Sequence, residues 1–464
     1  MTTAVILGAG IAGLTTAFRR GRGPTILLEA SPRAGGAIHT LREDGFVLEG
    51  GPNTLRTTEA AERLVADLGL TREIVLADPK APRWIVRGGA PRAVIPGPQG
   101  LFNRVFTTRG KLRLLKELFI APRLASLEDE SVDSFFRRRF GEEAARYGAG
   151  PMVSGVYAGD PETLSIRSAF PHLWLAEERS GSVTKDFLSG KEWKPDDGNA
   201  GKRRFRPRTL NFSRGLSMLV DTFVERFPSL GVDLQLSAAA AAVEGPRVPA
   251  PAGRRWTVRT ADGRSFDADV LVLTLTAPAL ARLLGDRLPR SRTLLSAVPS
   301  SPLTVVILAF EAPAAAGDAP HGFGALIPRG EGFRALGVLY PSSLFSGRAP
   351  AGFLVTTSFL GGALDPALAA ASDREVLALA SREVARFFPR LGPHVRSWIV
   401  RWPEAIPQLP LGHHRTLAAL EADLADLGRS AGADGTLLVT GAFRDGIALG
   451  ERIARGEAIG RSLA

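Results

Sequence analysis

The sequence predicts an α/β fold that begins with a Rossmann-like unit of strand, helix and strand, and three observations support this prediction. Ala4–Leu7 is entirely apolar, which indicates a buried strand. The glycines that follow have the spacing G-x-G-x-x-G, and they are Gly8, Gly10 and Gly13. Ile11–Arg20 has helical character, and Thr25–Leu28 is a second apolar run that ends at the acidic Glu29. The strand before the glycines and the helix after them indicate a dinucleotide-binding turn.

Each glycine of this turn has its own physical task. Gly8 allows the tight turn out of the strand, Gly10 lets the backbone approach a pyrophosphate, and Gly13 lets the helix pack on the strand. The phosphates then face the free N–H groups and the positive dipole end of the helix. Glu29 can accept hydrogen bonds from ribose hydroxyls, and its charge disfavours a 2′-phosphate. The predicted dinucleotide contacts in this unit are Gly8, Ala9, Gly10, Ile11, Ala12, Gly13, Glu29 and Ala30.

A second glycine-rich stretch narrows the choice of dinucleotide. Arg33–Ala37 matches the motif R-x-G-G, and Gly50–Thr54 reads Gly-Gly-Pro-Asn-Thr. With both motifs the sequence resembles the flavoproteins with two dinucleotide-binding domains, which include amine oxidases, phytoene desaturases and protoporphyrinogen oxidases. The resemblance implies FAD, with its pyrophosphate along the second motif and its isoalloxazine over the Gly-Pro-Asn segment. It also implies FAD contacts at Arg33, Gly36, Ala37, Gly51, Pro52, Asn53 and Thr54.

Composition excludes several other classes of protein. The 464 residues are 45% hydrophobic and 23% charged, which is typical of a globular protein with two or three domains. The absence of cysteine excludes disulfides, a thiolate nucleophile and cysteine-bound metal or iron–sulfur clusters. We expect no signal peptide, because the first motif begins at residue 4, and no transmembrane helix, because no run of 18 apolar residues occurs. The six histidines have no metal-binding spacing, so we expect no metal and assign no catalytic acid or base.

The net charge of +11 is concentrated in one part of the chain. Residues 80–208 contain 24 Lys and Arg against 15 Asp and Glu. Within them, Arg109–Leu124 has leucines and Phe119 on one face and basic residues elsewhere, which predicts an amphipathic basic helix. Its apolar face either packs on a core or lies on a membrane surface. Because no nucleic-acid module is recognisable, we expect an anionic membrane or a polyanionic substrate, and no nucleic acid, as the partner of this charge.

Other elements are predicted from periodicity and turn residues. Helices are expected over residues 57–70 and 215–227, from Ser131 onward, and from about residue 449 to the C-terminus. Strands are expected at residues 84–86 and 93–95 around a Gly88-Gly89 turn that Arg92 closes, and at 256–260 and 265–266 in a hairpin around Asp262-Gly263. Further strands are expected at 232–243, 270–275, 303–310, 324–327, 335–340, 353–359 and 437–440.

The most specific resemblance lies in the middle of the chain. Ser154–Pro161 is a glycine-rich turn that leads into the apolar segment Leu164–Pro171, and its chemistry alone indicates no function. The two segments match the signature G-[VI]-[YF]-A-G-[DN] … L-S-x-x-[SA]-x-F-P of protoporphyrinogen oxidases, and the resemblance extends from residue 4 to about 460. One departure occurs near the C-terminus, where Gly450–Arg452 replaces the usual Asn-Asp-Cys, so side-chain contacts from these positions are in doubt.

The resemblance implies a domain organisation and further site residues. Residues 1–88, 209–299 and 403–464 would form a discontinuous FAD-binding domain, residues 89–208 an inserted, mainly helical membrane-binding and substrate-channel domain, and residues 300–402 a substrate-binding domain with a mixed sheet. Further FAD contacts are implied at Val243, Trp402, Gly441, Gly446, Ile447 and Ala448. Substrate contacts are implied at Arg92, which pairs with a propionate, and at Asn53, Gly155, Leu326, Leu339 and Phe359. The ordinary alternatives stay open: a solvated arginine at Arg92, a turn residue at Asn53, and strand core for the three apolar side chains.

The implied activity is the FAD-dependent six-electron oxidation of protoporphyrinogen IX to protoporphyrin IX in haem biosynthesis, with O2 as electron acceptor and H2O2 as product. The enzyme would be cytoplasmic and peripheral on the inner face of the cell membrane, and a homodimer is left open. A coproporphyrinogen III oxidase is one alternative, which a second cationic cluster in the pocket would favour. A flavin-free, prenyl-binding module like the GDP-dissociation inhibitors is another, against which Glu29, Gly36 and the Gly446 turn argue. A generic amine oxidase would leave the Gly155–Pro171 signature unexplained.

Overall fold

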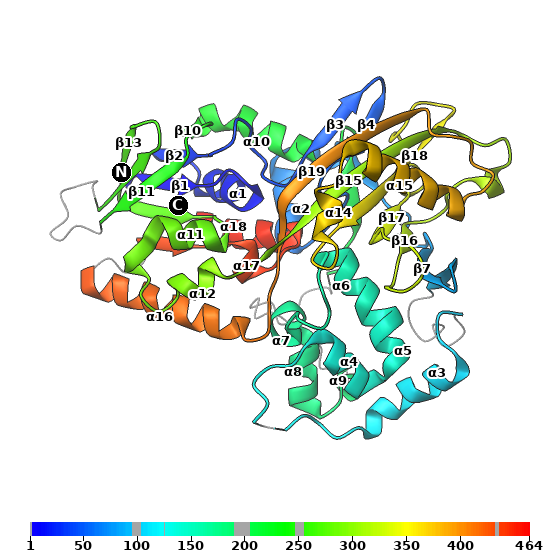
Figure 1. Cartoon of the computed structure of the whole chain (residues 1–464). Helices are drawn as coiled ribbons and strands as arrows, with labels where there is room; N and C mark the ends of the chain where they lie inside the picture. The colour runs from blue at the N-terminus through cyan, green and yellow to red at the C-terminus, as the bar shows by residue number, and fades with distance from the viewer. Residues whose placement is uncertain (1, 95–103, 125, 190–204, 246–254, 432–435) are drawn as a thin grey trace.

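The computed structural model describes residues 2–94, 104–124, 126–189, 205–245, 255–431 and 436–464. They form three connected parts, namely a region around a parallel sheet that holds both chain ends, a region around a larger mixed sheet, and a helical lobe (Figure 1). Within these ranges no helix combines the length and the hydropathy needed to cross a bilayer.

The parallel sheet has the strand order β10-β2-β1-β14-β20. Its strands are β1 (Ala4–Leu7), β2 (Thr25–Leu28), β10 (Val232–Gln235), β14 (Val270–Leu273) and β20 (Leu437–Val439). All four pairings are parallel, so the C-terminal ends of the strands meet at one edge. The crevice at such an edge is where open α/β sheets bind their ligands.

Helices cover one face of this sheet, and a small antiparallel sheet with further helices covers the other. On the first face lie α1 (Ile11–Arg20), α2 (Glu59–Asp67), α10 (Ser217–Leu230) and α18 (Leu449–Ser462). On the second lie β11 (Ala240–Glu244), β12 (Trp256–Thr260), β13 (Ser265–Ala268), α11 (Ala277–Leu284), α12 (Arg292–Ser296) and α16 (His413–Ala431). The single strand predicted over residues 232–243 is wrong, because the chain turns at Ser237, which has a positive φ, and β10 and β11 belong to different sheets.

The mixed sheet has seven strands in the order β19-β15-β18-β17-β16-β7-β8. They are β7 (Arg83–Arg87), β8 (Ala90–Val94), β15 (Ser300–Glu311), β16 (Gly324–Leu326), β17 (Gly337–Leu339), β18 (Phe353–Gly361) and β19 (Arg396–Pro407). Helices α14 (Pro366–Ala369) and α15 (Asp373–Phe387) cover one face of this sheet. The four strands predicted between residues 303 and 359 are confirmed.

The hairpin of β7 and β8 belongs to the mixed sheet, because β7 pairs in parallel with β16. A domain boundary at residue 88 would therefore cut through this hairpin, and one between residues 402 and 403 would cut through β19. The prediction that Arg92 closes the hairpin turn is wrong. Arg92 lies inside β8 opposite Ile85, and the turn consists of Gly88 and Gly89, which both have positive φ.

The helical lobe contains α3 (Thr108–Leu115), α4 (Val132–Phe140), α5 (Glu142–Ala144), α6 (Gly150–Tyr157), α7 (Ile166–Ala169), α8 (Pro171–Ser180) and α9 (Val183–Leu188). Helix α4 begins where predicted, and the hydroxyl of its N-cap Ser131 accepts a hydrogen bond from the N–H of Ser134 at 3.1 Å. Helix α3 ends nine residues before the predicted Leu124. A 3₁₀ turn follows over Lys116–Phe119, and within it Glu117 turns into the lobe and pairs with the buried Arg139.

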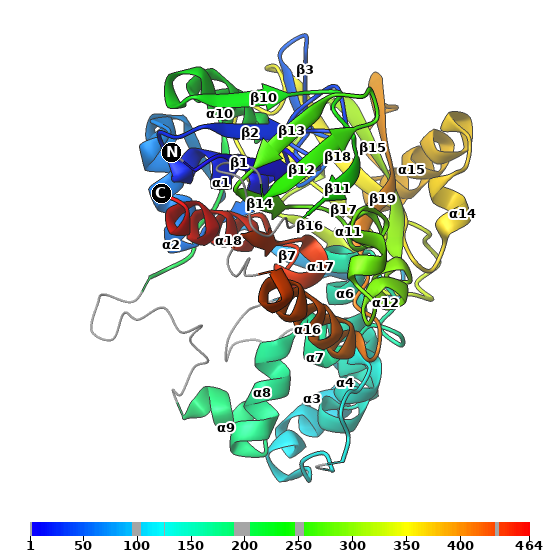
Figure 2. The ribbon, with the colours of Figure 1, turned by 90° about the vertical axis from the view of Figure 1, so that its left-hand side faces the viewer.

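Smaller elements connect the three parts. They are β3 (Thr40–Glu43), β4 (Phe46–Glu49), β5 (Leu55–Arg56), β6 (Ile74–Leu76), β9 (Thr209–Phe212), α13 (Pro341–Leu344) and α17 (Ala442–Asp445). Phe46 and Leu48 of β4 pack with Val305 of the mixed sheet, which joins the two sheet regions. In Figure 2 the helical lobe lies below both, with α16 beside it.

Candidate active site

The turn after β1 has the geometry predicted for its three glycines. Gly8 has a φ of +100°, in the region that favours glycine. A Cβ on Gly13 would overlap the carbonyl oxygen of Gly8, so α1 approaches the strand this closely only with glycine there. Gly10 differs, because it has a φ of −70° and no atom lies within 4 Å of the place a Cβ would take. One side of Gly10 is therefore open to a ligand.

The N-terminus of α1 presents hydrogen-bond donors to this open side. Gly10 is the N-cap residue, no side chain caps the helix, and its first turn has no acidic residue. The side chains of Ile11 and Ala12 are buried, so the backbone N–H groups of the first turn are what this helix end offers to an anion.

Glu29 lies at the end of β2, beside the same turn. Its Oε2 accepts the N–H of Ala9 at 2.7 Å, and its Oε1 accepts the N–H of Ser31 at 2.9 Å. These bonds fix the carboxylate, and each oxygen keeps a lone pair for a ribose hydroxyl. Ala30 follows on the surface. Val243 lies in the edge strand β11 with its side chain buried, so only its backbone is available to an adenine.

The second glycine loop lies directly against the first. The N–H of Gly35 donates to the carbonyl of Ala9 at 2.8 Å, and a Cβ on Gly36 would lie 3.2 Å from the Cα of Gly10. Arg33 donates to the carbonyls of Gly36 at 2.7 Å and Ile38 at 3.0 Å, so it braces this loop through the loop's own backbone. Gly36 and its neighbour Ala37 are exposed beside the open side of the first turn.

Gly50 and Gly51 are held between this loop and strand β19. A Cβ on Gly51 would overlap the carbonyl oxygen of Ala37, and one on Gly50 would lie 2.8 Å from Cγ2 of Val400. The indole N–H of Trp402 donates to the carbonyl of Gly50 at 2.7 Å. This segment therefore joins the parallel-sheet region to the mixed sheet at a point where only glycine fits.

The residues on either side of these glycines fix the segment. Pro52, Asn53 and Thr54 are partly buried, and the Asn53 amide donates to the carbonyl of Gly51 at 3.0 Å, which is the turn role that the sequence left open. Before the glycines, the buried carboxylate of Glu49 accepts the side-chain amide of Asn211 at 3.0 Å. Burial raises the pKa of Glu49, although hydrogen bonds oppose this shift.

The turn after β20 reaches the same edge of the parallel sheet. The N–H of Thr440 donates to the carbonyl of Leu273 in β14 at 2.9 Å, and the carboxylate of Asp445 accepts the N–H of Gly441 at 3.1 Å. Gly446 has a φ of +93°, and a Cβ there would overlap the carboxylate of Glu451. Ile447 and Ala448 follow and lead into α18.

The three residues that depart from the family have structural roles in this turn. A Cβ on Gly450 would lie 2.6 Å from the carbonyl oxygen of Arg56, so glycine permits this approach. Arg452 is buried and lies 3.3 Å from the carboxylate of Asp445. The carboxyl of Glu451 lies beside Gly446, and desolvation raises its pKa.

Together these segments fit an extended dinucleotide. The first turn offers an open glycine and a helix N-terminus to a pyrophosphate, and Glu29 offers acceptors to a ribose. The N-terminus of α18 follows the Gly446 turn, and its dipole favours negative charge there. We expect this arrangement to hold FAD, which accepts two electrons per substrate oxidation when bound.

A row of directly paired residues crosses the whole mixed sheet on the face away from α15. In strand order it is Val400, Val305, Phe359, Gly337, Leu326, Ile85 and Arg92. Directly opposed residues point to the same face, and Leu339 joins them because it lies two residues after Gly337. The row begins with Val400 against Gly50 and ends with a cation, Arg92. Leu326, Leu339 and Phe359 are only partly buried, unlike the neighbouring Val338 that faces α15.

Helix α6 approaches this face through Gly155. A Cβ on Gly155 would lie 2.6 Å from Cδ2 of Leu326, so the two predicted substrate contacts are neighbours. Two residues later the buried Tyr157 donates its hydroxyl to the carbonyl of Ala169 at 3.0 Å, and burial raises its pKa. Ile447 packs against the same apolar cluster, so α6 lies between the C-terminal turn and the sheet. The predicted turn at Ser154–Tyr157 is wrong, because these residues form the end of a helix.

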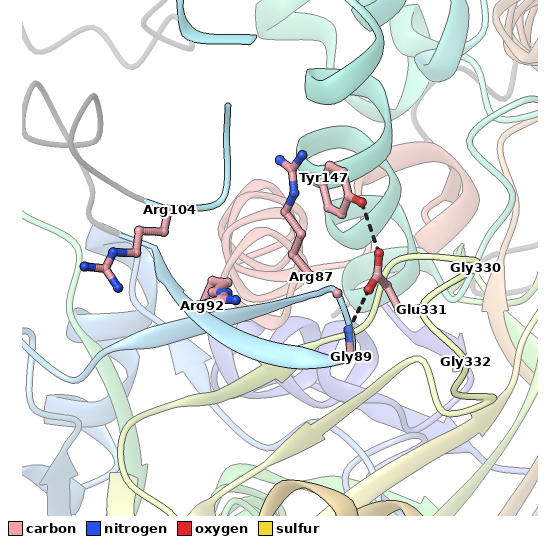
Figure 3. Close-up of a pocket in the computed structure, with 9 residues that line it drawn as sticks. Arg87, Gly89, Arg92, Arg104, Tyr147, Gly330, Glu331 and Gly332 are labelled. Atoms are coloured by element: carbon pink, nitrogen blue, oxygen red, sulfur yellow. Dashed lines mark hydrogen bonds between the residues drawn. The ribbon is translucent and has the colours of Figure 1, made fainter. Parts of the chain in front are cut away.

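A cavity of about 820 Å³ opens at the cationic end of the row. Figure 3 shows Arg92 and Arg104 on one side of this cavity and Tyr147 and Glu331 on the other, with Arg87 beside Tyr147. The Glu331 carboxylate accepts the Tyr147 hydroxyl at 3.0 Å and the N–H of Gly89 at 3.1 Å.

Sequence reasoning identified only Arg92 in this cavity. The register of the hairpin could have identified Arg87, because a turn at Gly88-Gly89 pairs Arg87 with Ala90 and places it on the face of Arg92. Tyr147 and Glu331 are 184 residues apart, and no local pattern indicates that they meet.

Comparisons with known proteins agree with this geometry. A family model described as flavin containing amine oxidoreductase matches residues 11–447. Protoporphyrinogen oxidase 1 of Spinacia oleracea chloroplasts is 32% identical over 97% of this chain and 82% of its own length. Coproporphyrinogen III oxidase of Bacillus subtilis is 27% identical over 98% of this chain and 96% of its own. The crystal structure of a proposed protoporphyrinogen oxidase from Exiguobacterium sp. has the same fold, with a TM-score of 0.77, 21% identity, and coverage of 99% of this chain and 98% of that one.

The chain belongs to the flavin-containing amine oxidoreductases, so it is an oxidoreductase and its cofactor is FAD. The mixed α/β fold of this family, expected from the two glycine motifs, is confirmed. The more specific resemblance, to the protoporphyrinogen oxidases, is confirmed by relatives of 30–32% identity that align with nearly the whole chain.

Proposed function

We propose that the protein oxidises a porphyrinogen to the corresponding porphyrin, with protoporphyrinogen IX as the substrate. The observation that supports this most strongly is the row across the mixed sheet. It offers an apolar floor at Phe359 and Leu326, a cation at Arg92, and one end against the Gly50 segment. A large apolar ring with acid groups on one edge has the matching chemistry.

FAD supplies the redox chemistry of this reaction. Removal of six electrons requires three cycles, and O2 takes the electrons from each cycle and leaves as H2O2. The part assigned to the protein is to hold the macrocycle between the sheet face and α6 and to keep water from it. We assign no side chain as acid or base.

The test is an anaerobic titration of the purified, FAD-containing protein with protoporphyrinogen IX, followed by admission of O2. The expected result is bleaching of the flavin absorbance, growth of porphyrin fluorescence, and H2O2 on reoxidation. Coproporphyrinogen III is the second substrate, because a relative of that name aligns with 98% of the chain. Flavin that stays oxidised with both porphyrinogens would refute the proposal.

We further propose that the helical lobe binds the inner face of the cell membrane. Large apolar side chains are exposed at the end of the lobe that carries α3 and α9, and they are Leu112, Leu115, Phe119, Leu124, Phe187 and Leu188. Phe119 is 87% exposed, so the alternative of a core-facing helix does not account for it. Arg109, Lys111 and Lys116 lie in the same segment and suit anionic lipid.

Vesicle binding tests this surface. Leu115→Glu/Phe119→Glu is expected to bind anionic vesicles at least about tenfold more weakly, because two apolar side chains no longer enter the lipid. Val224→Glu on α10 is the matched control, since Val224 is also exposed but lies on the parallel-sheet region. Equal sedimentation of wild type and both variants with vesicles would contradict the assignment.

A further inference from the structure

The cavity at the end of the row contains more cations than its own carboxylates neutralise. Arg87 pairs with Glu143 at 3.2 Å and stacks on the Tyr147 ring at 4.4 Å. Glu331 lies 3.7 Å from Arg146. Arg92 and Arg104 have no carboxylate within ion-pair distance among the described residues. The cavity therefore has two arginines whose charge no carboxylate of the described part of the chain compensates.

The rest of the cavity wall is fixed by its own bonds. Glu331 is nearly buried and accepts from both Gly89 and Tyr147, so it ties the hairpin turn to the helical lobe. Burial, and then Glu331, raises the pKa of the Tyr147 phenol, which stays protonated and a donor to that carboxylate. Glu331, Tyr147 and Gly89 are hydrogen-bonded to one another, so among the described residues Arg92 and Arg104 are the cavity's cations without a carboxylate partner, and they can bind a ligand that enters it.

The two free arginines come from different segments and line one cavity. Arg92 belongs to β8 and ends the row through Phe359 and Leu326, whereas Arg104 comes from the segment that precedes α3, and the two lie on the same side of the cavity (Figure 3). A ligand that lies along the apolar row can therefore reach both arginines only with acid groups on a single edge. Arginine suits this task because its planar fork matches a carboxylate.

We propose that Arg104 is a second carboxylate-binding residue, so that Arg92 and Arg104 together bind two neighbouring acidic side chains on one edge of the tetrapyrrole. This inference rests on the proposed function and specifies its substrate class, a porphyrinogen with two carboxylates on one edge. Additional carboxylates on the opposite edge would face Leu326 and Phe359, where their desolvation is unfavourable. The arrangement thus favours protoporphyrinogen IX over the tetracarboxylate coproporphyrinogen III.

The experiment compares the acid form of the substrate with its neutral ester. KM is measured for protoporphyrinogen IX and for its dimethyl ester with wild type, Arg104→Ala, Arg92→Ala and the double variant, all loaded with FAD. Arg104→Ala is expected to raise KM for the acid about tenfold and to leave KM for the ester unchanged. Tenfold corresponds to the weakest charge-assisted hydrogen bonds, which suits an exposed residue such as Arg104. In the double variant, KM for the acid and KM for the ester are expected to be equal. Arg104→Lys is expected to have a KM for the acid between those of wild type and Arg104→Ala.

Two controls separate charge recognition from a structural effect. Arg83→Ala changes an arginine on the same face of β7 that lies outside the cavity and stacks on Phe323, and it is expected to behave as wild type. Binding of the product protoporphyrin IX, followed by its fluorescence, must weaken in parallel with the rise in KM.

An Arg104→Ala variant with the wild-type KM for the acid would overturn the inference. A variant that raises KM for the acid and for the ester by the same factor would also overturn it. A lower KM for coproporphyrinogen III than for protoporphyrinogen IX would also overturn it. If wild type with bound FAD oxidises neither porphyrinogen, the proposed function itself fails, and the inference fails with it. Oxidation that is insensitive to Arg104 refutes the inference alone.

Discussion

Substitution of Gly10 by alanine separates cofactor binding from folding. The backbone of Gly10 has φ −70° and ψ 174°, which alanine adopts freely, and no atom lies within 4 Å of the added Cβ. In the FAD-free protein the change is expected to be neutral or to stabilise by about 0.4–1 kcal/mol, because alanine restricts the unfolded chain. The only space that the methyl group takes is the space assigned to the pyrophosphate.

The expected loss is in FAD affinity. The methyl group holds the phosphate away from the N-terminus of α1, and one charge-assisted hydrogen bond is worth about 1.5–3 kcal/mol. Because about 1.4 kcal/mol corresponds to a tenfold change in Kd, Gly10→Ala is expected to bind FAD roughly 10–150-fold more weakly. The assay is a titration of FAD-free protein with FAD, together with thermal unfolding of the FAD-free form.

Gly13→Ala is the matched control. Its Cβ would overlap the Gly8 carbonyl oxygen, so α1 must move from β1 and the FAD-free protein itself should unfold at a lower temperature. The reasoning would be refuted if Gly10→Ala kept wild-type affinity for FAD, or if it destabilised the FAD-free protein as much as Gly13→Ala does.

Three further outcomes follow from the structure. Gly155→Ala brings a methyl group against Leu326, and this overpacking of about 1 kcal/mol should raise KM roughly fivefold; an unchanged KM would place Gly155 outside the substrate pocket. Glu117→Ala removes the nearer of the two carboxylates from the buried Arg139, which keeps Glu177 at 3.5 Å, and should cost about 3 kcal/mol in denaturant unfolding, the lower end for a broken buried pair. A variant as stable as wild type would contradict this expectation. Burial opposes the charge of Glu117, but hydrogen bonds from Ser182, Thr184 and Arg139 outweigh it and lower its pKa, so its contribution is present above the unfolded pKa and is lost as the pH falls through the folded pKa. Desolvation raises the pKa of Glu451, so the stability it contributes is present at low pH and is lost as the pH rises through its folded pKa. Glu451→Gln should remove this dependence of the unfolding temperature on pH. A variant with the wild-type pH profile of thermal unfolding would contradict this.

The glycine motifs could be understood from the sequence because their requirements are local. Gly8 needs a positive φ, Gly10 needs an open side, and Gly13 needs contact with the strand that precedes it by only a few residues. The same is true of the N-cap at Ser131, whose hydroxyl bonds three residues ahead. The apolar strands of the mixed sheet were predictable for a related reason, since their hydrophobic patterns record which faces are buried.

Other features depend on contacts that no local pattern records. Helix α3 gives way to a 3₁₀ turn in which Glu117 pairs with Arg139, 22 residues later in the chain. The hairpin carrying Arg92 joins the mixed sheet through a parallel pairing with β16, more than two hundred residues away.

The cavity that receives Arg92 is likewise a product of the tertiary structure. Arg104 and Tyr147 reach it from the helical lobe, and Glu331 reaches it from the loop between β16 and β17. The sequence by itself determined the dinucleotide turn and the class of fold, because backbone conformation and hydrophobic period are properties of short segments. Only the tertiary structure decided that Arg92 and Arg104 line one cavity away from the carboxylates of the described residues, because the pairing of charges depends on distances between segments that are far apart in the sequence.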